Sequence, residues 1–125
     1  MSRLLVPRNL WAKAQSLSEI GVEELAWRPN DAAQVMELLR QTEIAVLGGD
    51  VYVKPNGRFE ASYENWYAER DQHEMPSTFA SRSRSIASEY LANLMKPGLA
   101  ECWVTLVLSE PMEPADEDDL ASDLS

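Results

Sequence analysis

The chain has 125 residues, with 21 acids against 11 bases and a formal net charge of −10 at pH 7. Its length favours one domain with a modest core, and its acidity disfavours direct binding to nucleic acid, because phosphate contacts need a basic surface. A single cysteine and a single histidine exclude an intrachain disulfide and a two-histidine metal site. No run is suited to cross a bilayer and no signal-peptide pattern is present, so we expect a cytoplasmic protein without membrane contacts.

The N-terminal third of the chain predicts helices. Apolar residues between positions 10 and 17 have helical spacing, so we expect one or two short helices before residue 28. A proline at position 29 ends them, and Asp31 can cap the next helix. Ala32, Val35 and Leu39 fall on one face of that helix, which is predicted over residues 31–42.

Residues 44–53 form the most informative run, because a strand pattern passes through two adjacent glycines, Gly48 and Gly49. Glycines weaken a strand, so they need a structural reason: a bulge, a sharp bend or close approach by another backbone. Asp50 follows them, and its carboxylate can bond backbone N–H groups that the glycines leave unpaired. We therefore interpret Gly48 and Gly49 as structural and leave the role of Asp50 open.

The turn residues 55–57 predict a hairpin that returns the chain into a second strand over residues 58–64. In this strand Phe59, Ala61 and Tyr63 alternate with polar residues, which indicates one buried and one solvated face. The sequence then leaves the strand at residues 65–67, where packing is the preferred role of Trp66 and an interface role stays open for Tyr67.

A long helix over residues 77–95 and a third strand over residues 101–108 complete the domain. The fold class is α+β: a small, mainly antiparallel sheet near 44–53, 58–64 and 101–108, packed by the helices near 31–42 and 77–95. We expect the third strand to pair beside the first and the long helix to cover one face. The predicted domain spans residues 1–110, and the acidic residues 111–125 are expected to be disordered.

Catalytic chemistry is poorly represented in the sequence. The acids Asp50, Glu64, Glu69, Asp71 and Glu74 could hold a divalent metal for a small enzyme, but their spacing is not diagnostic, and a solvated surface is the preferred interpretation. The segment 81–85 is a small basic patch that resembles a phosphorylation or RNA-binding run by composition only. An adaptor whose acidic tail binds a basic partner is a third possibility.

Three segments together resemble a known family: Ile44-Ala-Val-Leu-Gly-Gly-Asp-Val-Tyr52, Tyr63-Glu-Asn-Trp66 and Trp103-Val-Thr-Leu-Val107. Over about residues 20–108 the chain is similar to immunity protein 40, from bacterial polymorphic toxin and contact-dependent inhibition systems. The resemblance implies an α+β protein without catalysis or cofactor that binds and neutralises a toxin domain encoded nearby. A nuclease is one toxin that an acidic inhibitor would suit. When free, such a protein is expected to be a monomer or weak dimer.

The resemblance also separates scaffold from contact surface. Family members would neutralise different toxins, so their shared motif is expected to hold the fold, which concerns Gly48, Gly49, Asn65 and Trp66. Toxin contacts are expected in the exposed hairpin strand and the loop after it, with Asp50 assigned to either role. The predicted toxin-binding residues are Asp50, Glu60, Glu64, Tyr67, Glu69, Asp71 and Glu74.

Overall fold

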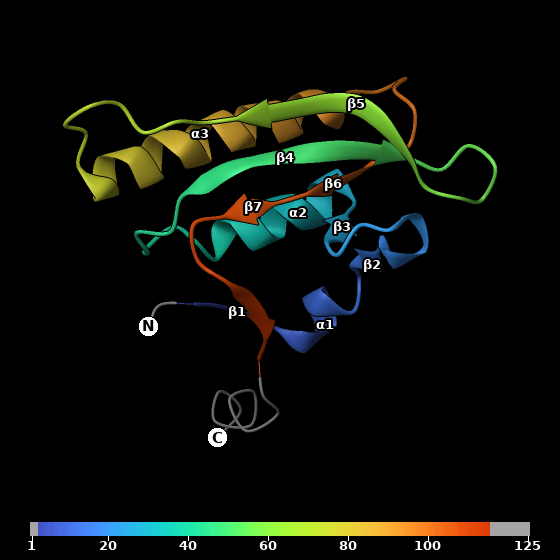
Figure 1. The fold of residues 1–125 in the computed structure, drawn as a ribbon, viewed down its shortest axis with the longest axis horizontal. Helices are drawn as coiled ribbons and strands as arrows, with labels where there is room; N and C mark the ends of the chain where they lie inside the picture. Colours follow the sequence, from blue (N-terminus) through green and yellow to red (C-terminus); the bar gives the residue numbers. More distant parts are fainter. Residues whose placement is uncertain (1–2, 116–125) are drawn as a thin grey trace.

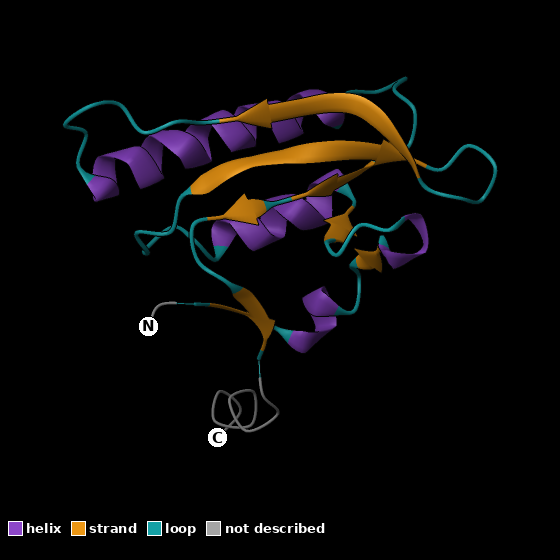
Figure 2. Cartoon of the chain, in the orientation of Figure 1, coloured by secondary structure: helices purple, strands orange, loops and turns teal. Residues whose placement is uncertain are grey.

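The structure, a computed structural model, describes residues 3–115 and contains three α-helices and an open, mostly antiparallel sheet (Figures 1 and 2). The predicted α+β class is confirmed. In chain order the elements are β1 (Leu4–Val6), α1 (Arg8–Trp11), β2 (Gln15–Ser16), the 3₁₀-helix η1 (Ser18–Ile20), β3 (Leu25–Trp27), α2 (Pro29–Glu37), β4 (Val46–Val53), β5 (Glu60–Tyr67), α3 (Pro76–Leu94), β6 (Trp103–Thr105), β7 (Val107–Leu108) and β8 (Met112–Pro114).

The main sheet has the strand order β2-β3-β6-β4-β5, with β7 also paired to β4, and all of these pairs are antiparallel. The expected neighbours are confirmed, because β6 and β7 occupy the predicted strand 101–108 and pair with β4. Figure 1 shows β4 and β5 side by side as the two longest strands. Strand β5 has no further neighbour in the described chain, so it is an edge strand.

Helices α2 and α3 contact each other and lie against one face of the sheet, with α3 behind β5 and α2 behind β7 in Figure 1. The expected cover by the long helix is thus confirmed. Leu91 of α3 is buried in the principal core with Val51 and Val104 of the sheet. Trp66 of β5 stacks on Tyr90 of α3, with 4.7 Å between ring centroids. The burial of each such side chain contributes about 1.5–3 kcal/mol.

The helix boundaries agree with the sequence at α3 and differ at α2. Helix α3 begins and ends within one residue of the predicted range. Helix α2 begins at Pro29 rather than at Asp31, because proline has a suitable φ and needs no hydrogen-bond partner in the first helical turn. It ends at Glu37, and the chain continues in tighter turns, in which the N–H of Leu39 donates to the carbonyl of Met36 at 3.0 Å.

The two adjacent glycines lie where three strands approach closely. A Cβ atom on Gly48 would meet the Trp66 carbonyl oxygen and lie 3.0 Å from the Tyr67 Cα. A Cβ on Gly49 would meet the Thr105 carbonyl oxygen and lie 2.7 Å from Trp66 Cζ3. The pairing of β4 with β7 also shifts register between Val46 and Gly48. The sequence leaves three explanations for the two glycines: a bulge, a sharp bend or close approach by another backbone. Close approach applies to both glycines, and a bulge is also present at Gly48.

The carboxylate of Asp50 does not have the backbone-capping role that the sequence allowed. It makes no hydrogen bond within residues 3–115, where it is exposed. Instead, the backbone N–H of Asp50 donates to Thr105 Oγ1 at 3.0 Å. A threonine hydroxyl from the neighbouring strand thus supplies the acceptor at this irregular position, which leaves the Asp50 side chain free.

One buried serine connects the long helix to the sheet. The Oγ of Ser83 accepts a hydrogen bond from the N–H of Val46 at 2.9 Å and donates one to the carbonyl of Ala80 at 2.9 Å. Ser83 is fully buried, so its hydroxyl is the available partner for the first N–H of β4. This hydrogen bond sets the position of α3 relative to β4, the strand that carries the two glycines.

The N-terminal segment contains strands that the sequence did not predict. The expected short helices are present as α1 and η1, but β2 and β3 lie between and after them and extend the sheet. Trp27 at the end of β3 is fully buried. These strands have two and three residues, too few to show the alternation by which a strand is recognised in sequence.

The ordered domain extends beyond the predicted boundary at residue 110. Met112–Pro114 form β8, which pairs in parallel with β1, and the N–H of Ala115 donates to the Val6 carbonyl at 2.8 Å. The sequence predicts disorder from residue 111, but the prolines at 111 and 114 are compatible with this short pairing, because a two-stranded ribbon tolerates proline at its edge. The rest of the predicted disordered tail, residues 116–125, lies outside the described residues.

The close approach at Gly49 gives a first prediction. We expect Gly49→Ala to lower the free energy of unfolding by about 3 kcal/mol, because the new methyl group would overlap a backbone carbonyl that cannot move independently of β6. Gly57→Ala is the matched control, since a Cβ there meets nothing within 4 Å and only its positive φ opposes the change, at a cost of about 1 kcal/mol. Urea denaturation measures both, and equal midpoints would contradict the argument.

A second prediction concerns the contact between α3 and β4. We expect Ser83→Ala to lower the free energy of unfolding by about 1–3 kcal/mol, because the buried N–H of Val46 loses its acceptor. Ser85→Ala on the same helix is the control, because Ser85 is exposed and its replacement is expected to change stability by less than about 0.5 kcal/mol. Similar denaturation curves for the two variants would show that the hydrogen bond is unimportant.

Candidate functional site

The sheet face opposite the two helices is only partly covered. Cross-strand partners share a face, and Gly48 lies opposite Tyr67 on one side and Val107 on the other, while Asp50 lies opposite Asn65. At one end of this face a small cluster forms a local cover, made of Leu17, Ala26, Tyr52 and Phe59. Towards the other end, Tyr67 is 73% exposed and Val107 is 39% exposed. Asp50 and Asn65 are also exposed, so this part of the face is open to a partner.

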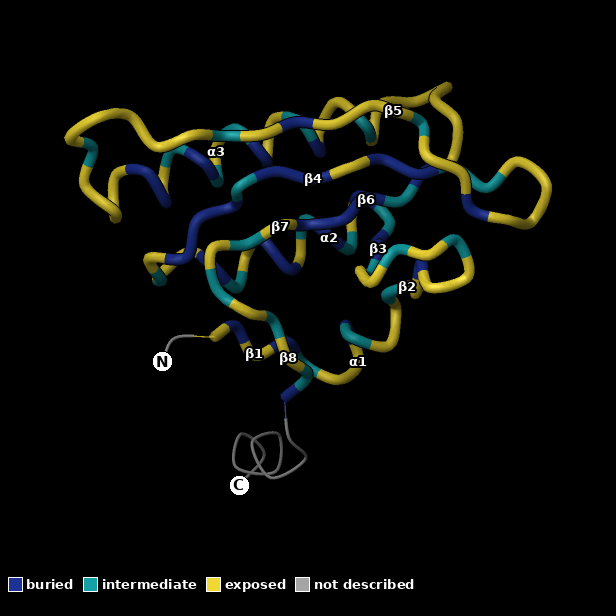
Figure 3. The backbone as a smooth tube through the Cα atoms, in the orientation of Figure 1, coloured by how far each residue is buried: buried dark blue, intermediate teal, exposed yellow. Residues whose placement is uncertain are grey.

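Strand β5 borders this open face and is exposed along nearly its whole length, as the yellow trace of Figure 3 shows. Within β5 only Trp66 is buried. The strand carries Glu60 and Glu64 and no lysine or arginine.

The predicted contact residues of β4 and β5 are therefore accessible, but on both sides of the edge strand. Asp50 and Tyr67 lie on the open face, whereas Glu60 pairs with Val53, which packs against the core on the helix side. Glu64 also lies towards the helices, near Tyr90 of α3, whose pKa is raised by burial and by this carboxylate.

Strand β5 contains a bulge that changes its pattern. Asp50 pairs with Asn65 and Tyr52 pairs with Ala61, so three residues, Ser62 to Glu64, lie opposite Val51 alone. The hydroxyl of Ser62 donates to the Val51 carbonyl at 2.9 Å and accepts from the N–H of Glu64 at 3.2 Å. The strand continues to Tyr67, three residues beyond its predicted end.

The bulge turns Tyr63 outward. Tyr63 was predicted to face inward with Phe59 and Ala61, but it is 90% exposed and has a φ of 66°. Ala61 is exposed as well, so of the three only Phe59 is buried. Simple alternation fails here only within the bulge: the two extra residues keep Ala61 and Asn65 on the same face, but Tyr63 between them has a positive φ and turns out of the strand. Tyr63 is therefore an exposed aromatic residue of β5 that the alternating sequence pattern does not reveal.

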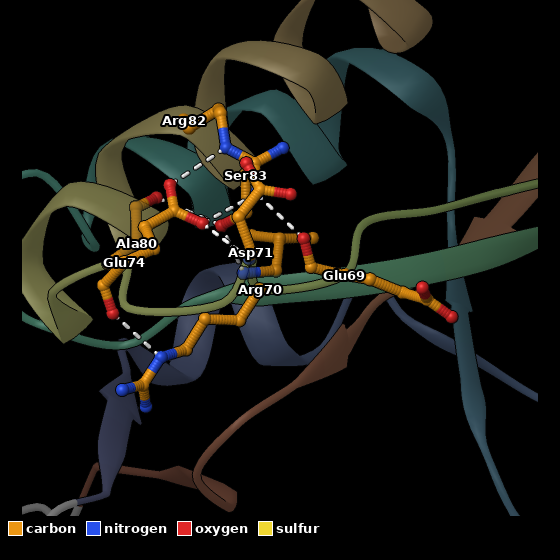
Figure 4. A network of polar contacts seen from close by, with 8 residues as sticks. Glu69, Arg70, Asp71, Glu74, Ala80, Arg82 and Ser83 are labelled. Carbon is orange, nitrogen blue, oxygen red and sulfur yellow. Dashed lines mark hydrogen bonds and ion pairs between the residues drawn. The ribbon is translucent and has the colours of Figure 1, made fainter.

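The loop after β5 is held against the start of α3 by Arg82 (Figure 4). The Arg82 guanidinium donates to the carboxylate of Glu74 at 2.9 and 2.7 Å and to the Glu69 carbonyl at 2.6 Å. Glu74 also accepts from the N–H of Asp71 at 2.9 Å, and Arg70 Nε donates to the Glu74 carbonyl at 2.8 Å. We call this set the Arg82 latch: Glu69, Arg70, Asp71, Glu74 and Arg82.

The latch decides which acids of the loop can reach a partner. The Glu74 side chain is only 8% exposed, whereas that of Asp71 is 78% exposed and lies 3.8 Å from Arg82. The hydrogen bonds from Arg82, and then that from the Asp71 N–H, lower the pKa of Glu74 from 4.5 to about 2. Glu74 is therefore engaged in holding the loop, while the carboxylates of Glu69 and Asp71 are exposed on the surface, that of Asp71 in a long ion pair with Arg82.

The segment 81–85 is structural rather than a basic recognition patch. Arg82 belongs to the latch, and Arg84 donates to the carbonyls of Thr42 at 3.2 Å and Ile44 at 3.4 Å. Ser83 is buried against β4. Nitrogens of both guanidinium groups are therefore already engaged within the fold.

The geometry of the acids does not suggest a metal centre. Within residues 3–115, no group of three or more His, Cys, Asp or Glu side chains is placed to bind a metal ion. Cys102 is buried, and this burial raises the pKa of its thiol, so it is poorly suited to act as a nucleophile. Two surface grooves of about 800 and 550 Å³ lie elsewhere, and none of the predicted contact residues lines them. An exposed surface outside a groove suits protein binding better than small-molecule binding.

Comparison with models of known protein families assigns the chain to one family. The family model described as immunity protein 40 matches residues 16–108. The chain belongs to the immunity protein 40 family. A comparison with curated proteins and a comparison with solved structures gave no match. The family implies an immunity protein that binds and neutralises a cognate toxin, which is a role without catalysis. None of the helices within residues 3–115 has both the length and the apolar character of a membrane span.

The immunity protein 40 match includes the glycine pair, the bulge and the latch, and it leaves out β1, α1 and β8. Of the four residues interpreted as scaffold, Gly48, Gly49 and Trp66 lie at the close approach of the strands. Asn65 differs, because its side chain is exposed on the open face beside Asp50. Its position allows contact with a partner as readily as a role in the fold.

The lowered pKa of Glu74 gives a third prediction. A carboxylate whose pKa falls on folding stabilises the folded state above its unfolded pKa of 4.5, and this contribution is lost as the pH falls towards 2. We expect Glu74→Gln to lower the Tm at pH 7, and the difference from the parent protein to shrink as the pH decreases from 4.5 towards 2. Differential scanning calorimetry from pH 7 to pH 2 measures this difference in Tm.

Glu69→Gln is the control for this titration, because Arg82 contacts the Glu69 carbonyl and not its carboxylate. We expect its Tm to follow that of the parent protein at every pH. A constant Tm difference for Glu74→Gln from pH 7 to 2 would show that the latch does not depend on the ionised carboxylate.

Proposed function

We propose that this immunity protein neutralises its toxin through the surface formed by the open end of β4, strand β5 and the latched loop. We call this surface the acidic face and define it by Asp50, Glu60, Glu64, Tyr67, Glu69 and Asp71. The observation that carries the proposal is that all six side chains are exposed on adjoining elements, with no groove or metal-binding cluster among them. Glu74, also predicted as a contact, belongs in this proposal to the support of the loop.

The charge of the acidic face favours a toxin with a basic surface. Five of its six residues are carboxylates, and opposite charge speeds encounter and excludes wrong partners. Toxin domains that cut nucleic acid need a basic active site, because they must contact phosphates. A nuclease is therefore our preferred partner, with the carboxylates of the immunity protein in the positions of its phosphates.

Neutralisation then needs no chemistry from this chain. The loop is held by the Arg82 latch and β5 is held by β4, so the contact surface is ordered before binding and little entropy is lost on association. We propose that the protein acts in the cytoplasm of the producing cell, as a monomer or weak dimer when free. The toxin is proposed to be encoded nearby.

Co-expression tests this function. The toxin domain encoded by the adjacent upstream gene is expected to stop growth when expressed alone and to be tolerated when this chain is expressed with it. An inactivated form of the same domain should bind the purified protein well below micromolar concentration in calorimetry. A harmless neighbour, or no binding at micromolar concentration, would refute the proposal.

A fourth prediction locates the contact. We expect the double substitution Glu60→Lys and Glu64→Lys to lower the association rate at least about tenfold at low ionic strength, because rim charges act mainly on encounter. The same change in net charge at Glu19 and Glu89, which are exposed outside the acidic face, is the control. Surface plasmon resonance at two salt concentrations measures both. An equal decrease of the association rate in the two double variants would mean that the rate depends only on the net charge of the protein.

A further inference from the structure

The Ser62–Glu64 bulge holds a large aromatic residue in an unfavourable conformation. Tyr63 has a φ of 66°, a region that L-residues other than Gly, Asn and Asp rarely adopt because Cβ crowds the following carbonyl. Such conformations persist only where neighbouring contacts determine them. Here the Ser62 hydroxyl supplies these contacts, since it bonds the Val51 carbonyl on β4 and the N–H of Glu64 on its own strand.

The aromatic ring of Tyr63 contributes little to the packing of the fold. The Tyr63 side chain is 90% exposed, the highest value among the exposed large hydrophobic residues in the described chain. The ring takes part in none of the aromatic pairs or cation–π contacts found there. Asparagine or glycine would satisfy the backbone of this position at lower cost. A strained backbone and a ring without contacts in the fold therefore occur at one residue, directly next to Glu64 of the acidic face.

We propose that Tyr63 is the anchor of toxin binding: its ring enters a pocket on the basic surface of the toxin, presented by a bulge that is formed before binding. This inference rests on the proposed function and deepens it. Tyrosine is among the residues that dominate binding energy, because it buries a large rigid area at the cost of few rotatable bonds. A preformed anchor also avoids the entropy of ordering a loop.

The residues next to the ring indicate the chemistry of the pocket. Glu64 follows Tyr63 directly, and Glu60 lies on the same strand, with no lysine or arginine between residues 59 and 69. A pocket that accepts the ring while facing these carboxylates is best rimmed by arginine or lysine, which can pair with the acids and also stack on the ring. A second copy of this chain does not fit, because its acidic face would meet another of like charge.

The bulge also determines how the toxin is approached. An edge strand commonly binds partners by adding a neighbouring strand to its free backbone groups. In β5 the residues of the bulge interrupt the regular ladder at the centre of the strand, so a long added strand cannot stay in register. Binding through the projecting side chains of the bulge is the mode that this geometry favours.

Tyr63→Asn gives the sharpest test, because asparagine tolerates a positive φ and removes the ring. With the inactivated upstream toxin domain as probe, we expect the Kd to rise at least about 30-fold, which corresponds to the threshold of a binding hot spot. We expect the Tm of the free protein to stay equal or to rise. Leu99→Asn is the control, because Leu99 is 57% exposed outside the acidic face and its replacement should change the Kd less than about twofold.

Ser62→Ala tests the preformed bulge separately. It removes the hydroxyl that holds the bulge and leaves the Tyr63 ring in place, so we expect weaker binding with a folded protein. Full affinity for this variant would overturn the claim that the conformation is formed in advance.

The outcomes separate this inference from the proposed function. Unchanged toxin binding by Tyr63→Asn, together with weaker binding by the Glu60 and Glu64 double variant, would overturn the anchor and leave the proposed function standing. Absence of binding by the parent protein would overturn both. A lower Tm for Tyr63→Asn would show that the ring serves the fold, and loss of self-association in size-exclusion chromatography without loss of toxin binding would make a second copy the partner. Either result refutes the anchor.

Discussion

The structure depends on the close approach of three backbones at Gly48 and Gly49. A side chain at either position would overlap a carbonyl group of a neighbouring strand, so β4 can lie between β5 and β6 only because these residues have none. This approach also sets the position of the Trp66 ring, which packs over Gly49 and stacks on α3. A local absence of atoms thus determines how the sheet, its edge strand and the long helix fit together.

The functional surface is built on the outer side of this arrangement. Trp66 fixes β5 from the helix side, and the remaining residues of that strand are consequently free to face solvent. The Arg82 latch continues the same division into the loop, where Glu74 is used internally and Asp71 is left outside. Scaffold and contact residues therefore alternate along a short stretch of chain rather than occupying separate segments.

The sequence predicts those features whose signals are local. The hairpin turn, the helix α3 and the need for an explanation at the two glycines follow from residue type and spacing. The outward Tyr63 does not, because the bulge depends on a hydroxyl bond from Ser62 to the opposite strand. Glu74 looked like a surface acid because its partner is on the next helix, and β8 escaped notice because its partner is at the other end of the chain. In each case the deciding contact is non-local.

The Arg82 latch has a consequence for how members of one family can diverge. Two of its hydrogen bonds end on main-chain carbonyls, those of Glu69 and Glu74, which every amino acid provides. The course of the loop is therefore largely independent of the side chains at positions 69 and 71–73, all of which are exposed. Mutation there can change recognition without a new fold having to evolve. Single substitutions at these positions can therefore adapt the protein to a changed toxin, because the loop backbone keeps its course.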